Sequence, residues 1–268
     1  MRIARFLSAG QCYTGQLIDD QWALAMEGSI ADGLGLRPTT NRLRVEKLLA
    51  PLIPTDILCI GLNYREHAKE SGAELPLHPV LFIKAGNTLN NPSDPIVLPS
   101  LSQQVDYEAE LAIVIGRTAG RVSREDAMGY ILGYTCANDV SARDWQRDKS
   151  RSGGQWCRAK GFDGFCPLGP WIVTADELPN PNALRIRTVL NGTVMQDSNT
   201  SDMIFDIPAI IQSLSSTMTL RPGTVILTGT PPGVGFARQP PVFLRAGDQV
   251  VVEIEKIGTL ANRVTDCD

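Results

Sequence analysis

The chain has 268 residues, of which 43% are hydrophobic and 20% charged, and its 25 Lys and Arg against 29 Asp and Glu give a formal net charge of −4. This mixture is typical of an ordinary globular protein with one large domain, or one medium domain and a small appendage, and it excludes a disordered or collagen-like chain. The slight negative charge provides no basic surface for a nucleic acid, and no apolar run reaches the ~20 residues that cross a bilayer, so we expect no nucleic-acid partner and no membrane partner.

Cysteine and histidine usage narrows the choice of metal. The six cysteines contain no C-x-x-C pair, and His67 and His78 are the two histidines, so a zinc ribbon or a histidine-rich zinc site is hard to build. Carboxylates would hold a divalent cation, which favours Mg²⁺ or Mn²⁺. The start of the chain lacks the apolar stretch of a secretory signal, and we expect a cytoplasmic protein.

The first fifty residues predict a small N-terminal β cap, residues 1–53. Three short strands are expected at residues 2–7, 13–18 and 21–26, separated by Gly10 and the Asp19-Asp20 turn. Leu43, Val45, Leu48 and Leu49 have helical spacing before Pro51, which predicts a short amphipathic helix.

Strands dominate the second predicted domain, residues 54–268. The Asn191-Gly192 pair between two apolar runs predicts a hairpin, and Pro208 marks the first turn of a helix. The glycines of residues 228–235 precede prolines rather than a helix, so they are no dinucleotide fingerprint. The fold class is α+β and β-rich, with a mixed sandwich or roll rather than a wound βαβ sheet. Further strands are expected at residues 57–60, 80–83, 96–98, 108–115, 130–136, 171–173, 224–227 and 249–255.

Three acidic residues form the most informative pattern. Glu108 and Glu110 alternate along a predicted strand, which places them on one face with α-carbons roughly 6.6 Å apart. An exposed edge strand would explain such a pair without a metal, but the apolar run that follows on both faces indicates an interior strand. Asp139 ends another apolar strand. The three side chains can therefore form an oxygen cage for a hard cation.

A second pattern is a His and Glu pair. If the segment after Tyr64 is helical and stops at Gly72, His67 and Glu70 share one face and form a candidate general base. Such pairs are also common on inert surfaces, and His78 has no acidic neighbour. Lys160 lies among small residues and is a candidate to stabilise negative charge on a substrate, whereas Lys84 and Arg143 stand where strands end and are substrate-binding candidates.

These segments occur together and in an order that resembles the fumarylacetoacetate hydrolase family, in its branch without a long N-terminal domain. That branch includes acylpyruvate hydrolases, hydroxyhepta-dienedioate isomerases and oxaloacetate-acting members. The resemblance covers about residue 57 to the end of the chain. The matching motifs are Gly61-Leu-Asn-Tyr64 with His67 and Glu70, Asp106-Tyr-Glu-Ala-Glu110, Asn138-Asp139-Val-Ser-Ala-Arg-Asp144, Ala159-Lys-Gly-Phe-Asp163 and Thr228-Gly-Thr-Pro-Pro-Gly233.

The resemblance implies a mixed β-sandwich roll of the fumarylacetoacetate hydrolase C-terminal type, a homodimer, and one Mg²⁺ or Mn²⁺ ion held by Glu108, Glu110 and Asp139. It implies that His67 with Glu70 activates water, that Lys160 stabilises charge on the substrate, and that Thr230 and Arg143 hold it. The short cap differs from the long SH3-like domain of the larger eukaryotic hydrolases, and the chain contains no tandem copy as in bifunctional isomerase-decarboxylases.

Three hypotheses for function follow. The first is metal-dependent hydrolysis of a carbon-carbon bond in a β-diketo acid such as an acylpyruvate, with a small 2-oxo or diketo acid as the partner. The second uses the same cation to stabilise an enolate, which gives an oxaloacetate decarboxylase or tautomerase or a 2-oxo-acid isomerase. The third is a non-catalytic protein with a structural ion, which predicts a saturated cage and ligand binding that is insensitive to Glu70→Gln.

Overall fold

The computed structural model describes residues 1–30 and 35–267, and strands make up most of its regular structure. A large mixed sheet has the order β4-β3-β2-β1-β14-β12-β11-β17-β6-β7, with β5 beside β1 and β8 beside β14. Its strands are β1 (Arg2–Ser8), β2 (Gln11–Leu17), β3 (Trp22–Glu27), β4 (Arg37–Arg44), β5 (Lys47–Leu49), β6 (Ile57–Gly61), β7 (Val80–Lys84), β8 (Leu89–Asn90), β11 (Ala109–Ile115), β12 (Ile131–Asn138), β14 (Cys166–Thr174) and β17 (Val225–Leu227).

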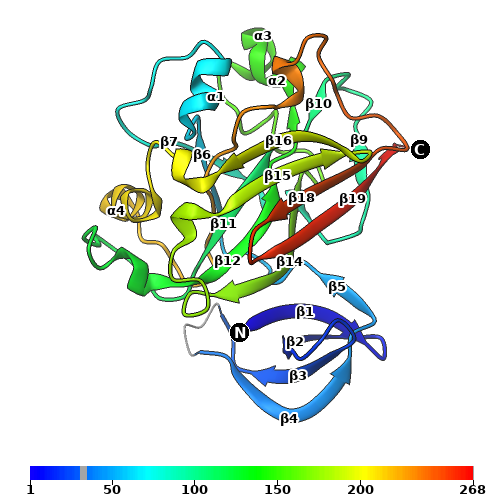
Figure 1. Cartoon of the computed structure of the whole chain (residues 1–268), viewed down its shortest axis with the longest axis vertical. Helices are drawn as coiled ribbons and strands as arrows, with labels where there is room; N and C mark the ends of the chain where they lie inside the picture. The colour runs from blue at the N-terminus through cyan, green and yellow to red at the C-terminus, as the bar shows by residue number, and fades with distance from the viewer. Residues whose placement is uncertain (31–34, 268) are drawn as a thin grey trace.

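A second sheet packs against the middle of the first. Its order is β16 (Thr193–Asn199), β15 (Arg185–Leu190), β18 (Gln249–Ile254), β19 (Gly258–Asp266) and β9 (Ile96–Leu98), and β10 (Val105–Asp106) pairs with β13 (Ser141–Ala142) nearby. Figure 1 shows the two layers, with β1 to β4 gathered at the end of the molecule away from α1 and α2. The α-helices are α1 (Arg65–Glu70), α2 (Arg143–Arg147), α3 (Lys149–Ser152) and α4 (Ile207–Thr217), and 3₁₀ turns cover Gly86–Thr88, Ala127–Tyr130, Pro181–Ala183, Thr200–Asp202 and Gly235–Ala237.

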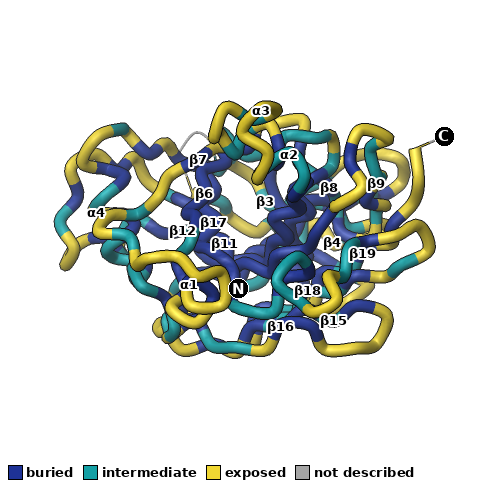
Figure 2. Tube along the Cα trace, turned by 90° about the horizontal axis from the view of Figure 1, so that it is seen from above, coloured by how far each residue is buried: buried dark blue, intermediate teal, exposed yellow. Residues whose placement is uncertain are grey.

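The core explains why β11 lacks polar alternation. Its Leu111, Ile113 and Ile115 belong to the apolar cluster that includes Ile186 of β15 and Ile254 of β18. Residues Ala112 and Val114 face the opposite cluster, so β11 is buried on both sides and lies in the dark central strip of Figure 2. The expected β-rich sandwich with mixed strand directions is confirmed, since β17 runs parallel to β6 and antiparallel to β11.

Two local predictions about turns are confirmed. Residues 185–190 and 193–199 form a hairpin whose turn residues, Asn191 and Gly192, have φ values of 50° and 79°, as a type I′ turn requires. Helix α4 begins at Ile207, and the Asp206 side chain accepts a hydrogen bond from the Ala209 backbone N–H.

The helix predicted around residues 43–49 is wrong. Leu43 lies in β4, Leu48 and Leu49 lie in β5 with Val45 between the two strands, and β5 pairs with β1 through Arg5 and Leu49. Leu43, Val45 and Leu48 pack around a small cluster that contains Phe6. Apolar spacing in so short a segment fits both a helix and a strand, and the pairing with β1 selects the strand. Strand β1 also pairs with β14 and so joins the large sheet, while the domain boundary at residue 53 stays a prediction.

No helix among the described residues is long and apolar enough to cross a membrane.

Candidate active site and metal centre

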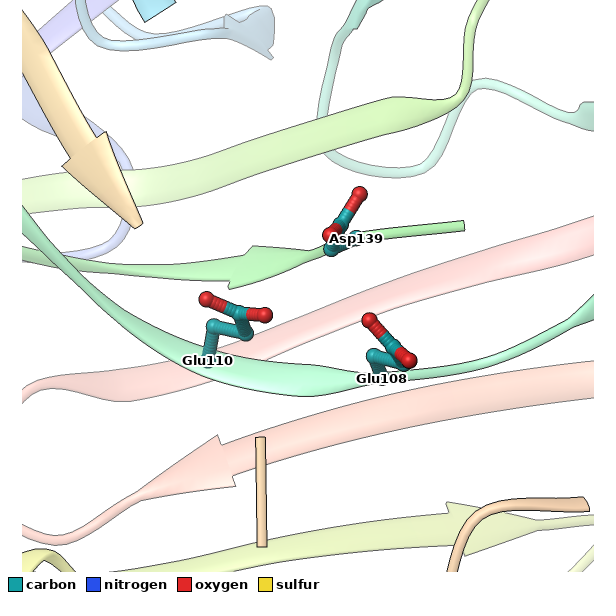
Figure 3. A group of neighbouring side chains, drawn as sticks. All are labelled: Glu108, Glu110 and Asp139. Atoms are coloured by element: carbon teal, nitrogen blue, oxygen red, sulfur yellow. The ribbon is translucent and has the colours of Figure 1, made fainter. Parts of the chain in front are cut away.

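Glu108, Glu110 and Asp139 converge at one point of the large sheet. Glu110 lies on β11, Glu108 immediately precedes that strand, and Asp139 follows the neighbouring β12. One carboxylate oxygen from each side chain lies within 4.8 Å of the other two, and Figure 3 shows the three side chains leaning into a common space. The arrangement follows from two facts in the sequence. Alternate residues of a strand share a face, and the antiparallel neighbour ends opposite them.

Cationic side chains neutralise two of the three carboxylates. The Lys160 ammonium lies 2.7 Å from Glu108 Oε2 and 2.5 Å from Asp139 Oδ2, and it also donates to Ser141 Oγ. Lys84 Nζ donates to Asp139 Oδ1 at 2.6 Å. Burial disfavours the ionised form of Glu108, but Arg143 and Lys160 outweigh that effect and hold its pKa below the usual range.

Glu110 differs because no Lys, Arg or His of the described residues forms a salt bridge with it. Its carboxylate accepts a hydrogen bond from the Gly229 backbone N–H at 2.6 Å. Burial, together with the charges of Asp139 and Glu108, raises its pKa well above the usual range. A buried carboxylate beside two others, without a cationic side chain of its own, is the environment that a bound cation stabilises.

The charge of the buried cluster also fits a divalent cation. The described residues place four carboxylates against three cations, so the fully ionised cluster carries one net negative charge. A divalent cation would make it net positive, which is the sign that attracts an anionic substrate. Only oxygen atoms are offered by the three converging side chains, as Mg²⁺ and Mn²⁺ prefer. The buried groups counted are Asp106, Glu108, Glu110, Asp139, Lys84, Arg143 and Lys160.

His67 and Glu70 form the expected pair on α1. His67 Nδ1 lies 3.2 Å from Glu70 Oε2, and the Glu70 carboxylate accepts a second hydrogen bond from the Gly233 backbone N–H at 2.9 Å. Helix α1 is followed by Gly72, whose φ of 64° favours glycine. Glu70 is thus held between a histidine and a distant loop, in a position to orient the imidazole ring.

A pocket of about 310 Å³ joins the two clusters. Seven of the nine residues predicted as site residues line it, namely His67, Glu108, Glu110, Asp139, Arg143, Lys160 and Thr230. Glu70 lies behind His67, and Lys84 lies behind Asp139 with a side chain that is 0% exposed. The placement of Lys84 therefore favours a role in holding Asp139 over the predicted direct contact with substrate.

Several other lining residues were not among the nine residues predicted for the site. The rings of Trp156 and Phe82 meet edge to face, with centroids 5.5 Å apart, and they form an apolar wall. A Cβ at Gly61 would lie 2.1 Å from a ring carbon of Trp156, so only glycine fits there. The remaining lining residues are Ile60, Leu62, Ser71, Ala73, Gln146, Arg147 and Phe236.

Asp106 and Gln196 support the site from behind. Asp106 is buried, lies 2.8 Å from Arg143 Nε, and accepts hydrogen bonds from the backbone N–H groups of Gly235 and Phe236. Gln196 Nε2 donates to Thr230 Oγ1 at 2.8 Å. Asp106 extends the alternation of Glu108 and Glu110 by one step, a signal that could have found it, whereas Gln196 comes from the second sheet and stands alone in the sequence.

Comparison with known proteins places these residues in a family context. Residues 56–265 match the family model described as fumarylacetoacetate (FAA) hydrolase C-terminal. The oxaloacetate tautomerase fahd2, mitochondrial, of Xenopus laevis is 51% identical over 218 residues, which cover 81% of this chain and 68% of that protein. The human oxaloacetate tautomerase FAHD2A, mitochondrial, is 48% identical over 227 residues, which cover 85% and 72%.

Solved structures resemble this chain over nearly its full length. A 5-carboxymethyl-2-hydroxymuconate delta-isomerase from Mycobacterium smegmatis superposes with a TM-score of 0.86 at 40% identity and covers 100% of both chains. A 2-hydroxyhepta-2,4-diene-1,7-dioate isomerase from Mycobacterium marinum has a TM-score of 0.84, again at 40% identity, over 99% of this chain and 98% of that one.

Proposed function

The chain belongs to the fumarylacetoacetate hydrolase family, and from that premise we propose that it is a metal-dependent tautomerase of oxaloacetate or a closely related 2-oxo dicarboxylic acid. The observation that carries the proposal is the buried trio of Glu108, Glu110 and Asp139, which lines the same pocket as His67. The relatives named as oxaloacetate tautomerases and the solved structures named as isomerases support tautomerisation over the hydrolysis that the sequence first suggested.

Glu108, Glu110 and Asp139 are the residues that would hold the cation, Mg²⁺ or Mn²⁺. When bound, such an ion supplies a Lewis acid that draws electron density from a 2-oxo group. Lys160 and Arg143 hold the Glu108 carboxylate from two sides, with Nζ–Oε2 and Nη2–Oε1 distances of 2.7 Å and 2.6 Å. Their contacts hold the Glu108 carboxylate in place, and the cluster would become net positive for an anionic substrate only with the divalent cation bound.

His67 is the group that we propose moves the proton. Glu70 accepts from Nδ1, which leaves Nε2 as the basic nitrogen and fixes the tautomer. Nε2 would take a proton from C3 of the 2-oxo acid while the C2=C3 double bond forms. The protonated Nε2 would then return this proton to the C2 oxygen, so His67 ends neutral and the reaction consumes no water. General acid-base groups of this kind contribute about 10² to 10⁴ in rate.

Hydrolysis of an acylpyruvate is the second candidate, and the His67 and Glu70 pair favours it because the same base can deprotonate water. A hydrolase also needs a donor for the oxyanion that forms at the attacked carbonyl. Lys160 was the predicted donor, but its ammonium already donates to Glu108, Asp139 and Ser141. An ammonium has three hydrogens, so none remains for the oxyanion in this arrangement.

The test follows enol absorbance and products with oxaloacetate and with acylpyruvates, in Mg²⁺ and in Mn²⁺. We expect faster loss of the oxaloacetate enol signal than in buffer, no more CO₂ than the enzyme-free metal solution releases, and no oxygen-18 in a carboxylate when the water is labelled. Label in a new carboxylate would establish hydrolysis, and CO₂ release above the enzyme-free level would establish decarboxylation. Enol conversion that persists unchanged after chelation would contradict the metal-dependent proposal.

We also propose that two copies associate through β7, the terminal strand of the large sheet. The strand exposes apolar side chains, with Leu81 at 36% and Ile83 at 52%, and an open apolar edge of this kind favours pairing with another chain. We expect sedimentation of a dimer for the natural sequence and of a monomer for Ile83→Lys. Val194→Lys, at an apolar side chain of β16 that is 41% exposed, should stay dimeric. A natural chain that sediments as a monomer would refute the proposal.

A further inference from the structure

One cationic side chain of the pocket has no acidic partner. His67, Arg143, Arg147 and Lys160 are its basic lining residues. His67 faces Glu70, and Arg143 and Lys160 both contact Glu108. Within the described residues, Arg147 forms no salt bridge with a carboxylate and no hydrogen bond from its guanidinium. The pocket therefore contains one guanidinium whose charge the protein leaves available.

The local geometry directs Arg147 toward the same space as Arg143. The two residues are four apart on α2 and so share a helix face. Both guanidinium groups lie over the ring of Phe236, with centroid distances of 4.5 Å for Arg143 and 5.3 Å for Arg147. The backbone N–H of Phe236 donates to Asp106, the carboxylate that also binds Arg143. Arg147 thus sits beside a ring that is held by the buried site.

Nearby acidic residues are engaged elsewhere. Asp144 accepts from the Ser102 hydroxyl at 2.6 Å and from the Trp145 backbone N–H. Asp148 accepts from Ser150 at the start of α3, and Arg151 lies 3.3 Å from it. Two arginines four apart on a helix also repel each other. A bound carboxylate next to Arg147 would relieve that repulsion and supply the missing partner.

We propose that Arg147 pairs with the distal carboxylate of the substrate and determines the preference of this enzyme for 2-oxo dicarboxylic acids over 2-oxo monocarboxylic acids. The inference rests on the proposed function in one respect, namely that the 2-oxo end binds at the acidic trio. The guanidinium fork matches a carboxylate in two-point contact, and its planar shape suits the stacked position on Phe236.

The test is a binding measurement with two ligands that cannot enolise. Trimethylpyruvate has no hydrogen on C3, and dimethyloxaloacetate is the same molecule with one methyl group replaced by a carboxylate. Calorimetric titration in Mg²⁺ gives the ratio of their two dissociation constants. We expect the unaltered protein to prefer the diacid, and Arg147→Gln to reduce that preference by about tenfold or more, as charged hydrogen bonds of this kind are worth. Arg147→Lys should retain part of it.

Arg151→Gln is the matched control. Arg151 lies on the next helix, α3, and contacts Asp144 and Asp148 outside the pocket lining. Replacing it with glutamine removes the same charge as Arg147→Gln. Its replacement should leave the ligand preference intact. The inference is overturned if the unaltered protein binds the two ligands equally, if Arg147→Gln keeps the preference, or if Arg151→Gln loses it to the same extent. Neither ligand can enolise, so their binding is measured apart from tautomerisation, and CO₂ release from dimethyloxaloacetate, a β-keto acid, is followed in parallel. An intact diacid preference without enol conversion would therefore contradict the tautomerase proposal and leave Arg147 supported.

Discussion

Replacing Glu110 with glutamine should remove both cation binding and activity. Glutamine keeps the size of the side chain and an oxygen that can accept from the Gly229 N–H, but it loses the charge. Changes to residues that merely support metal ligands cost 10 to 100-fold in affinity, so loss of a charged ligand should weaken Mg²⁺ binding by more than about 100-fold. Calorimetry of Mg²⁺ binding and the enol assay measure the two effects.

The fold of the Glu110→Gln variant should survive. Glu110 is 2% exposed, and among the described residues no cationic side chain forms a salt bridge with it. A neutral amide there removes repulsion from Glu108 and Asp139, so the metal-free variant should unfold in urea at the same or a higher midpoint. Glu66→Gln, an exposed carboxylate on α1, is the control and should keep metal binding. Full activity in Glu110→Gln would overturn the assignment of the metal site.

Replacing His67 with asparagine should reduce kcat while the cation still binds. Asparagine has no basic nitrogen for the C3 proton, and the expected loss is about 10² to 10⁴ in kcat. The three carboxylates remain in place, so Mg²⁺ affinity should change little and KM should stay within a few fold. Steady-state kinetics of enol conversion together with calorimetry separate these effects.

His78 provides the control for this experiment. It is exposed and does not line the pocket, so His78→Asn should retain full activity. The kcat of Glu70→Gln should lie between those of His67→Asn and His78→Asn. The glutamine amide can still contact the imidazole but no longer stabilises its protonated form. Unchanged kcat in His67→Asn, or equal losses in both histidine variants, would exclude His67 as the base.

The acidic trio illustrates what local pattern can predict. Glu108 and Glu110 alternate in a strand that continues as an unbroken apolar run, and that run indicated an interior position. Burial of all three carboxylates agrees with this expectation. The His67 and Glu70 pair on α1 could be predicted in the same way, since helical spacing and Gly72 suffice to place the two side chains side by side.

Other features depended on contacts between distant segments. Lys84 and Lys160 are separated by more than seventy residues, yet both contact Asp139, and nothing near either lysine indicates this partner. Sequence reasoning therefore placed Lys84 in contact with substrate, while its position behind Asp139 favours a supporting role. The segment at residues 43–49 became strands because β1 was available as a neighbour.

By itself the sequence determined the β-rich class, the hairpin at Asn191-Gly192 and the two acid-base patterns, because each depends on residues a few positions apart whose geometry follows from strand or helix period. Only the tertiary structure decided which charges pair, since Coulomb attraction and desolvation act through space between segments brought together by the core. That pairing neutralises Arg143 and Lys160, leaves Glu110 without a cationic side chain, and leaves Arg147 at the pocket without an acid among the described residues.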